Sequence, residues 1–175
     1  MPTGKNKVPM AEFRAVLEKA GLKDVRTYIQ TGNAIVRSKM AAREIETIIH
    51  RSLKDDMGVD MVAVVKTASQ FGKIMGDNPF VEEDTARIYF TLLAEKPKRA
   101  AMESFASIDF SPEKVEVRGD VVYTLYATKY SDSKFNNNFF ERKLGVAATT
   151  RNFNTMTKLL VSAKGDFRHS QDEKI

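Results

Sequence analysis

The 175-residue sequence contains no cysteine and only two histidines, and these absences exclude several kinds of site. Without cysteine, the chain can form no disulfide, no zinc–thiolate centre and no iron–sulfur cluster. His50 and His169 lie far apart in the sequence. We therefore expect no metal site and no cofactor, and we do not expect catalysis by a Cys–His pair or a Ser–His–Asp triad.

The sequence also lacks long apolar runs and the glycine-rich phosphate-binding motifs. No run approaches the ~20 apolar residues that a membrane-spanning helix needs. The first residues are polar and lack the apolar core of a signal peptide. Neither GxxxxGK[ST] nor GxGxxG is present. We expect a cytoplasmic protein without membrane contact, and no nucleotide site of either of these two kinds.

The charge is moderately basic, with a formal net charge of +5 and a pI of about 9.3. This excess permits contact with nucleic acid or with small acidic ligands. However, 23 acidic residues are interspersed with the basic ones and no basic tail is present. Charge alone therefore does not select a nucleic-acid partner.

Hydrophobic periodicity predicts two α+β halves, residues 1–79 and 80–163, followed by a flexible polar tail at 164–175. In the first half it predicts helices at 10–20 and 41–57, a hairpin with strands at 25–29 and 34–36, a buried strand at 61–65 and a short helix capped by Thr67 or Ser69. In the second half it predicts a strand at 88–93, a helix at 98–106, a hairpin with strands at 115–118 and 121–126, and helices at 135–144 and 153–161.

The two halves align through their helix–hairpin–helix parts, which makes a βαββαβ unit the parent pattern of each. The second half opens with a strand, whereas the first half has only the mostly polar residues 1–9 in that place. The opening strand of such a unit lies centrally in its sheet, and an unfilled place would leave backbone groups unpaired. We expect either a rearranged first sheet or a strand donated by a partner chain, which would make a homodimer.

A polar segment at 147–152 joins the last two predicted helices. Asn152 or Thr150 is suited to cap the second of these helices. A helix N-terminus presents free N–H groups and the positive end of the helix dipole, which favour an anion. Capping alone could also explain these residues, so the segment has both a binding interpretation and a purely structural one.

The binding interpretation predicts an anion held by Arg151, with hydroxyl and amide groups around it and further basic residues adding positive charge. The candidate ligand-binding residues are Arg151, Asn152, Thr150, Thr149, Asn154, Arg142, Lys143, Asn138 and Lys5.

The stretch FFERKLGVAATTRNFNTMTKLL, residues 139–160, resembles the C-terminal signature of the DUF1697 family of bacterial proteins, with Phe153 where that family usually has tryptophan. Residues 4–10 and 24–33 match the family as well. The resemblance implies an α+β fold of two ferredoxin-like halves, the first of which here lacks its usual opening strand, plus a C-terminal helix. It implies no activity.

Three hypotheses for function follow from these residues. The first is a binding module for a nucleotide or nucleic acid at Thr149–Asn154; strand aromatics such as Tyr89 and Tyr126 could also stack with bases. The second is an enzyme acting on a phosphorylated small molecule, with Glu141 as base and Arg151 as electrostatic stabiliser. The third is a structural or oligomeric protein in which the motif is an internal clamp. The sequence leaves open whether the chain is an enzyme.

Overall fold

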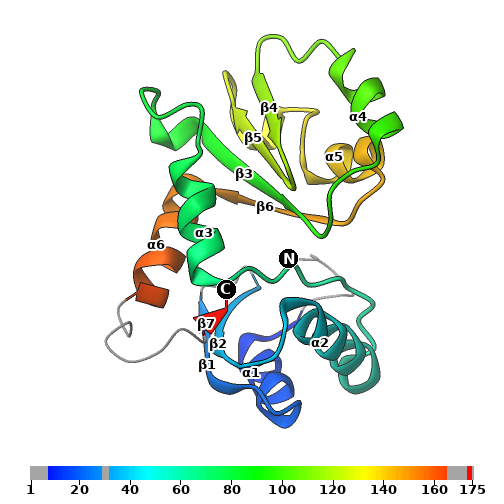
Figure 1. The fold of residues 1–175 in the computed structure, drawn as a ribbon, viewed down its shortest axis with the longest axis vertical. Coiled ribbons are helices and arrows are strands. Elements are labelled where there is room, and N and C mark those ends of the chain that lie inside the picture. The colour runs from blue at the N-terminus through cyan, green and yellow to red at the C-terminus, as the bar shows by residue number, and fades with distance from the viewer. Residues whose placement is uncertain (1–7, 29–31, 165–172, 175) are drawn as a thin grey trace. The chain divides into compact units, whose positions relative to one another are not determined.

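The computed structural model describes residues 8–28, 32–164 and 173–174, and it has an α+β fold (Figure 1). The chain divides into two compact units. The first unit comprises Met1–Gly72 and Leu159–Ile175, and the second comprises Lys73–Lys158. Helices α3 (Ala68–Gly76) and α6 (Phe153–Lys164) each contain residues of both units.

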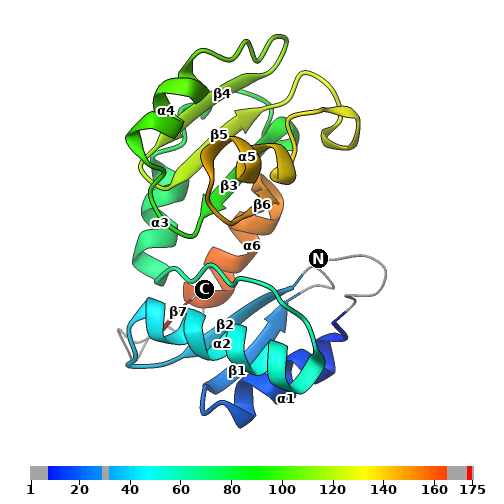
Figure 2. The same ribbon diagram turned by 90° about the vertical axis from the view of Figure 1, so that its right-hand side faces the viewer.

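The first unit consists of a three-stranded antiparallel sheet and two helices on one of its faces (Figure 2). Its strand order is β1-β2-β7. The elements are α1 (Met10–Lys19), β1 (Lys23–Tyr28), β2 (Asn33–Arg37), α2 (Ala42–Met57) and β7 (Glu173–Lys174).

The core of this unit follows from the apolar stripes of its helices. Ile45, Ile49 and Leu53 of α2 are buried at helical spacing. They pack in one cluster with Leu17 of α1. Gly58, in the left-handed conformation with φ of 66°, ends α2. The predicted helices and hairpin strands of this half are therefore present, within one or two residues of the expected bounds.

The predicted buried strand at 61–65 is wrong. These residues pair with no described strand, and Val62 is 52% exposed. The Val65 N–H donates to the side-chain Oε1 of Glu46 rather than to a neighbouring strand. An apolar run becomes a strand only where a ladder partner is available, and the strand beside β2 comes from the C-terminal end of the chain.

The C-terminal residues Glu173–Lys174 form β7, which pairs antiparallel with β2. Lys174 lies opposite Val36, and Glu173 lies opposite Arg37. The expectation of a loose tail therefore does not hold for these two residues, whose backbone is paired with a sheet. Among the described residues, the third strand of the first sheet thus comes from the C-terminal end of the chain, and the expected rearrangement relative to a βαββαβ unit stays a prediction.

The second unit has a four-stranded antiparallel sheet of order β4-β5-β3-β6. Its elements follow one another as strand, helix, two strands, helix, strand; the ferredoxin-like description of both halves stays a prediction. The elements are η1 (Thr85–Arg87), β3 (Ile88–Leu93), α4 (Arg99–Ala106), β4 (Lys114–Arg118), β5 (Val121–Leu125), η2 (Tyr130–Asp132), α5 (Asn137–Leu144) and β6 (Ala148–Asn152).

The polar segment between the last two helices is a strand rather than an irregular joint. Residues Ala148–Asn152 form β6, which pairs antiparallel with β3. The segment lacks apolar alternation, which is why periodicity did not identify it. Its two threonines are β-branched and suit an edge strand whose side chains are half-buried.

Helices α4 and α5 cover one face of this second sheet (Figure 2). Phe105 of α4 and Phe140 of α5 pack with Val122 and Leu93 of the sheet in one buried cluster. The predicted hairpin between β4 and β5 turns at Gly119, whose φ of 63° is of the kind that tight two-residue hairpin turns use.

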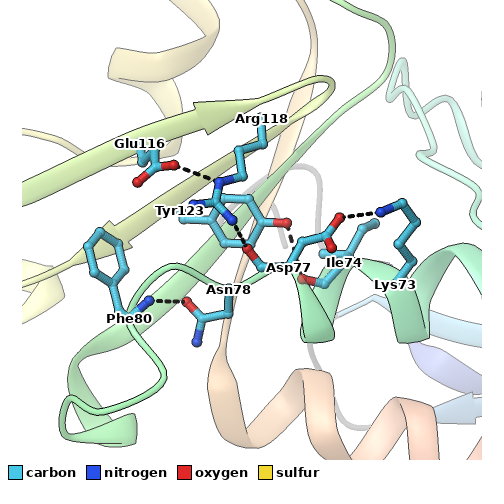
Figure 3. A network of polar contacts seen from close by, with 8 residues as sticks. All are labelled: Lys73, Ile74, Asp77, Asn78, Phe80, Glu116, Arg118 and Tyr123. Carbon is cyan, nitrogen blue, oxygen red and sulfur yellow. Dashed lines mark hydrogen bonds and ion pairs between the residues drawn. The ribbon is translucent and has the colours of Figure 1, made fainter.

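Side chains of β4 and β5 bind the backbone at the end of α3 (Figure 3). The Tyr123 hydroxyl donates to the Ile74 carbonyl at 3.1 Å, and Nη1 of Arg118 donates to the Asp77 carbonyl. Nε of Arg118 is in turn held by Glu116 at 2.6 Å. The last carbonyls of a helix lack intrahelical partners, so these contacts fix the end of α3 to the sheet.

Candidate functional site

The predicted ligand-binding residues around Thr150 form an internal clamp between α5 and β6. The Thr150 hydroxyl donates to Oδ1 of Asn137 at 2.9 Å and lies 2.8 Å from the hydroxyl of Thr91, which is fully buried. The Asn137 amide donates to the Ala148 carbonyl at 3.1 Å. Oε1 of Glu141 accepts from the Ala148 N–H at 2.7 Å. Helix and strand are thus joined by hydrogen bonds on both sides of Ala148.

Sequence reasoning named Asn138 as a ligand residue, but its neighbour Asn137 faces the strand. Asn138 is exposed on α5. Asn137 and Glu141 are four residues apart and therefore share one face of that helix. This spacing is a sequence signal that could have identified Asn137 and Glu141 as two residues that contact the same neighbouring element, here β6.

Arg151 lies half-buried on β6. Its Nη1 donates to the Thr149 hydroxyl at 2.6 Å and to the Thr150 carbonyl at 2.8 Å. Burial lowers the pKa of the Arg151 guanidinium, and the charge of Tyr130 opposes this effect. Arginine nevertheless stays protonated in proteins, so Arg151 contributes positive charge to this part of the second unit.

The remaining predicted residues that the structure describes lie on different parts of α5 and α6. Oδ1 of Asn152 accepts from the Thr155 N–H at 2.8 Å, so Asn152 is the N-cap of α6, as predicted. Asn154 is exposed in the first turn of that helix. Arg142 and Lys143 are exposed in the last turn of α5. Lys5 lies outside the described residues.

A pocket of about 580 Å³ lies in the second unit, where β3 begins and β5 ends. It is lined by residues of η1, of β3 and of the segment from the end of β5 to η2. The lining side chains that carry charge or an aromatic ring are Arg87, Tyr89, Tyr126, Lys129, Tyr130 and Asp132. Tyr89 lies opposite Asn152 in the β3–β6 ladder, so the pocket wall is next to the cap of α6.

Three tyrosines form the aromatic wall of this pocket. The rings of Tyr89 and Tyr130 are stacked, with centroids 4.8 Å apart and 7° between their planes. The ring of Tyr126 stands at 89° to both, at 5.1 and 5.4 Å. Burial raises the pKa of the Tyr89 hydroxyl, and the charge of Tyr130 adds to this effect. The Tyr89 hydroxyl is therefore protonated at neutral pH.

Hydrogen bonds from Arg87 and from Glu113 hold the backbone of the pocket-lining residues 126–128. Nε of Arg87 donates to the Tyr126 carbonyl at 2.6 Å, and the Tyr126 N–H donates to the Arg87 carbonyl at 2.9 Å. Glu113, only 7% exposed, accepts from the Ala127 N–H and from the Thr128 hydroxyl. These contacts fix the lining residues before any ligand arrives, which is typical of small-molecule sites.

Few local sequence signals predict this pocket. Arg87, Lys129 and Tyr130 lie in short segments without periodicity, and they meet because β3 pairs with β5. Glu113 follows the cis Ser111–Pro112 bond and is buried in an otherwise exposed stretch. No sequence pattern distinguishes it from the exposed glutamates.

The described residues contain no group of three or more metal-ligating side chains of the kinds His, Cys, Asp and Glu. Within that same part of the chain, no helix is both long and apolar enough to cross a membrane.

Fold and site together define an α+β protein with a small, partly aromatic pocket in its second unit. The family model described as "Protein of unknown function (DUF1697)" matches residues 2–123, and the chain belongs to this family. The two earlier stretches of resemblance fall within the matched residues, whereas the signature at 139–160 lies beyond them.

A solved structure, that of the conserved bacterial protein SP0830 from Streptococcus pneumoniae, has a similar fold. It is 22% identical in sequence, with a TM-score of 0.75 over 94% of this chain and 93% of that one. The likeness establishes the fold. No curated protein matches the chain.

Proposed function

We propose that this protein is a binding module for an anionic ligand, a nucleotide or a nucleic acid, held in the pocket of the second unit. The observation that supports this most is the joint presence of Arg87, Lys129 and a stacked tyrosine pair on one pocket wall. Guanidinium and ammonium groups bind phosphate and carboxylate, and aromatic faces stack with bases.

Arg87 is suited to this role because one nitrogen of its guanidinium is already fixed. The bond from Nε to the Tyr126 carbonyl orients the planar group. Its terminal nitrogens form no ion pair within the described part of the chain, and neither does Lys129. A group that is oriented in advance loses less conformational entropy when it binds a ligand.

Asp132 also lines the pocket and acts against an anion. Its Oδ1 accepts from the Ser131 hydroxyl at 2.9 Å. Among the side chains that line the pocket, Arg87 and Lys129 outnumber this single carboxylate. A second carboxylate, that of Glu113, is bound to the backbone N–H of Ala127 and to the hydroxyl of Thr128. The lining itself therefore carries a net positive charge.

In this proposal the Thr149–Asn154 segment does not bind the ligand. It pairs with β3, the strand that carries Tyr89 of the pocket. The Thr150 hydroxyl and the Asn137 amide are engaged with each other, and Asn152 is engaged with α6. These bonds favour the clamp interpretation for Thr150 and Asn152. They also weaken the enzyme hypothesis, because Glu141 accepts from Ala148 and would have to leave it to act as a base.

The test is a comparison of two double variants that remove the same charge. Binding of nucleoside monophosphates and of a single-stranded oligonucleotide is measured by calorimetry at low salt. We expect Arg87→Ala with Lys129→Ala to lower affinity at least tenfold. The matched control is Arg142→Ala with Lys143→Ala on α5, which should change it less than threefold.

A larger loss of affinity in the Arg142→Ala, Lys143→Ala variant than in the Arg87→Ala, Lys129→Ala variant would place the site on α5. Arg142 and Lys143 are among the ligand-binding residues predicted from the sequence. If none of these ligands binds to the unaltered protein at low salt, the proposal is wrong. Cooperative thermal unfolding of each variant, monitored by circular dichroism, shows that a loss of binding does not come from a loss of structure.

A further inference from the structure

We infer that the pocket takes a ligand of mononucleotide size, with its ring stacked on Tyr130 and its phosphate bound by Arg87 and Lys129. This inference rests on the proposed function and narrows it from anions in general to a single nucleotide. Two features of the pocket carry it: the geometry of the aromatic wall and the size of the space.

The aromatic wall is arranged so that a further ring would extend an existing stack. Tyr89 and Tyr130 are parallel and 4.8 Å apart, so each has one face turned to the other. The edge of Tyr126 packs against both rings, and Tyr89 and Tyr130 are both half-buried. Tyr89 lies on a sheet strand, whereas Tyr130 belongs to the segment after β5 that forms the other side of the pocket. The outer face of Tyr130 is the surface on which a flat ligand would lie.

The rings that form this wall are held in place. The Tyr126 hydroxyl donates to the Phe135 carbonyl, and the Tyr130 hydroxyl accepts from the Asn137 N–H at 3.3 Å. Asn137 is also the residue that clamps β6. A rigid aromatic platform gains stacking energy from a base without first having to be ordered.

The size of the pocket favours one nucleotide over a polymer. A space of about 580 Å³ lies in the volume range of small-molecule sites. Sites for single strands instead follow the backbone along a positively charged groove over several nucleotides. Here the lining residues with positive charge are Arg87 and Lys129, and the lining also includes the carboxylate of Asp132.

The polar groups of the pocket match the remaining parts of a nucleotide. The Tyr89 hydroxyl has no hydrogen-bond partner among the described residues and, being protonated, can donate to a phosphate oxygen. The Asp132 carboxylate can accept from ribose hydroxyls.

The experiment compares three kinds of probe by calorimetry on the full chain. These are the four nucleoside 5′-monophosphates, inorganic pyrophosphate as a ring-free anion, and a twelve-nucleotide single strand. Variants Tyr130→Leu and Tyr130→Phe separate the ring from the hydroxyl. We expect Tyr130→Leu to weaken at least one monophosphate by about tenfold, as loss of one stacked base predicts.

The affinity of Tyr130→Phe for the monophosphates should stay within about threefold of that of the unaltered protein. The affinity of Tyr130→Leu for pyrophosphate should be unchanged. Rescue by phenylalanine guards against a loss that comes from unfolding, since Tyr130 also packs against Tyr89. Pyrophosphate binding as tight as that of the monophosphates, with no effect of Tyr130→Leu, would overturn the inference but leave the proposed function standing.

Tighter binding of the oligonucleotide, with affinity falling steeply as salt rises, would also overturn it and make nucleic acid the ligand. If no probe binds, the proposed function and this inference fail together. If probes bind but respond only to Arg142→Ala with Lys143→Ala, both fail for this pocket.

Discussion

Tyr123 shows how one side chain connects the sheet of the second unit to the end of a helix. It is 1% exposed, its hydroxyl donates to the Ile74 carbonyl, and the Arg118 guanidinium lies 6.0 Å from its ring centroid (Figure 3). Burial, reinforced by the charge of Asp77, raises the pKa of Tyr123 to about 12. The neutral hydroxyl is therefore the form that the fold stabilises.

We predict that Tyr123→Phe lowers the free energy of unfolding at pH 8 by about 1 kcal/mol, the net value of one hydrogen bond. Because the folded pKa is above the unfolded value of 10, this stabilisation is complete below pH 10 and is lost as pH rises toward 12. Urea unfolding at pH 8 and pH 11 measures both effects.

The difference between Tyr123→Phe and the unaltered protein should be smaller at pH 11 than at pH 8. Ionisation of lysines and of other tyrosines affects both proteins, so it cancels in the comparison. A difference that is the same at the two pH values would contradict the assigned cause.

At the scale of elements, the sequence predicted the helices and hairpin strands that are marked by residues close to one another in the chain. The stripe of Ile45, Ile49 and Leu53 and the following Gly58 marked both the face and the end of α2. The strand β6 was missed because its identity depends on a ladder with β3, whose paired residues lie fifty-five or more positions earlier in the chain. The run at 61–65 was apolar but had no such partner.

The two asparagines at the start of α6 allow a matched test of a local signal. Asn152 caps the helix through its bond to the Thr155 N–H, whereas Asn154 is exposed. We predict that Asn152→Ala lowers the free energy of unfolding by roughly 0.5–2 kcal/mol. Asn154→Ala, the control, should change it by less than about 0.5 kcal/mol. Equal effects in thermal or urea unfolding would argue against the cap.

At the scale of the whole molecule, the candidate site was beyond prediction from the sequence. Arg87 and Lys129 are 42 positions apart in the numbering, and they share a pocket because Ile88 lies opposite Leu125 in the β3–β5 ladder. Periodicity predicts that each strand exists, but it does not give the register between strands. The tyrosines at 89 and 126 were recognised as strand aromatics, whereas Tyr130 was not.

The first unit gives a prediction of its own, because its sheet is completed by the far end of the chain. Removal of residues 173–175 deletes β7 and leaves Val36 and Arg37 at a bare edge of β2. We predict faster amide hydrogen exchange at these two residues and no change in β3 and β5 of the second unit. Exchange measured by mass spectrometry or NMR tests this.

Unchanged exchange at Val36 and Arg37 would show that β7 adds no protection. The homodimer through this edge of the first sheet stays a prediction. Size-exclusion chromatography of the shortened chain bears on it, because an uncovered strand edge is a template for pairing with another copy.

Both ends of the chain belong to the first unit, and the second is inserted between Gly72 and Leu159. Tension applied to the two termini is therefore borne by the contacts of the first unit, while the inserted unit carries no load. Only after the first unit has given way does the force reach the second. A molecule stretched from its ends would thus yield in a fixed order, with the pocket-bearing part last.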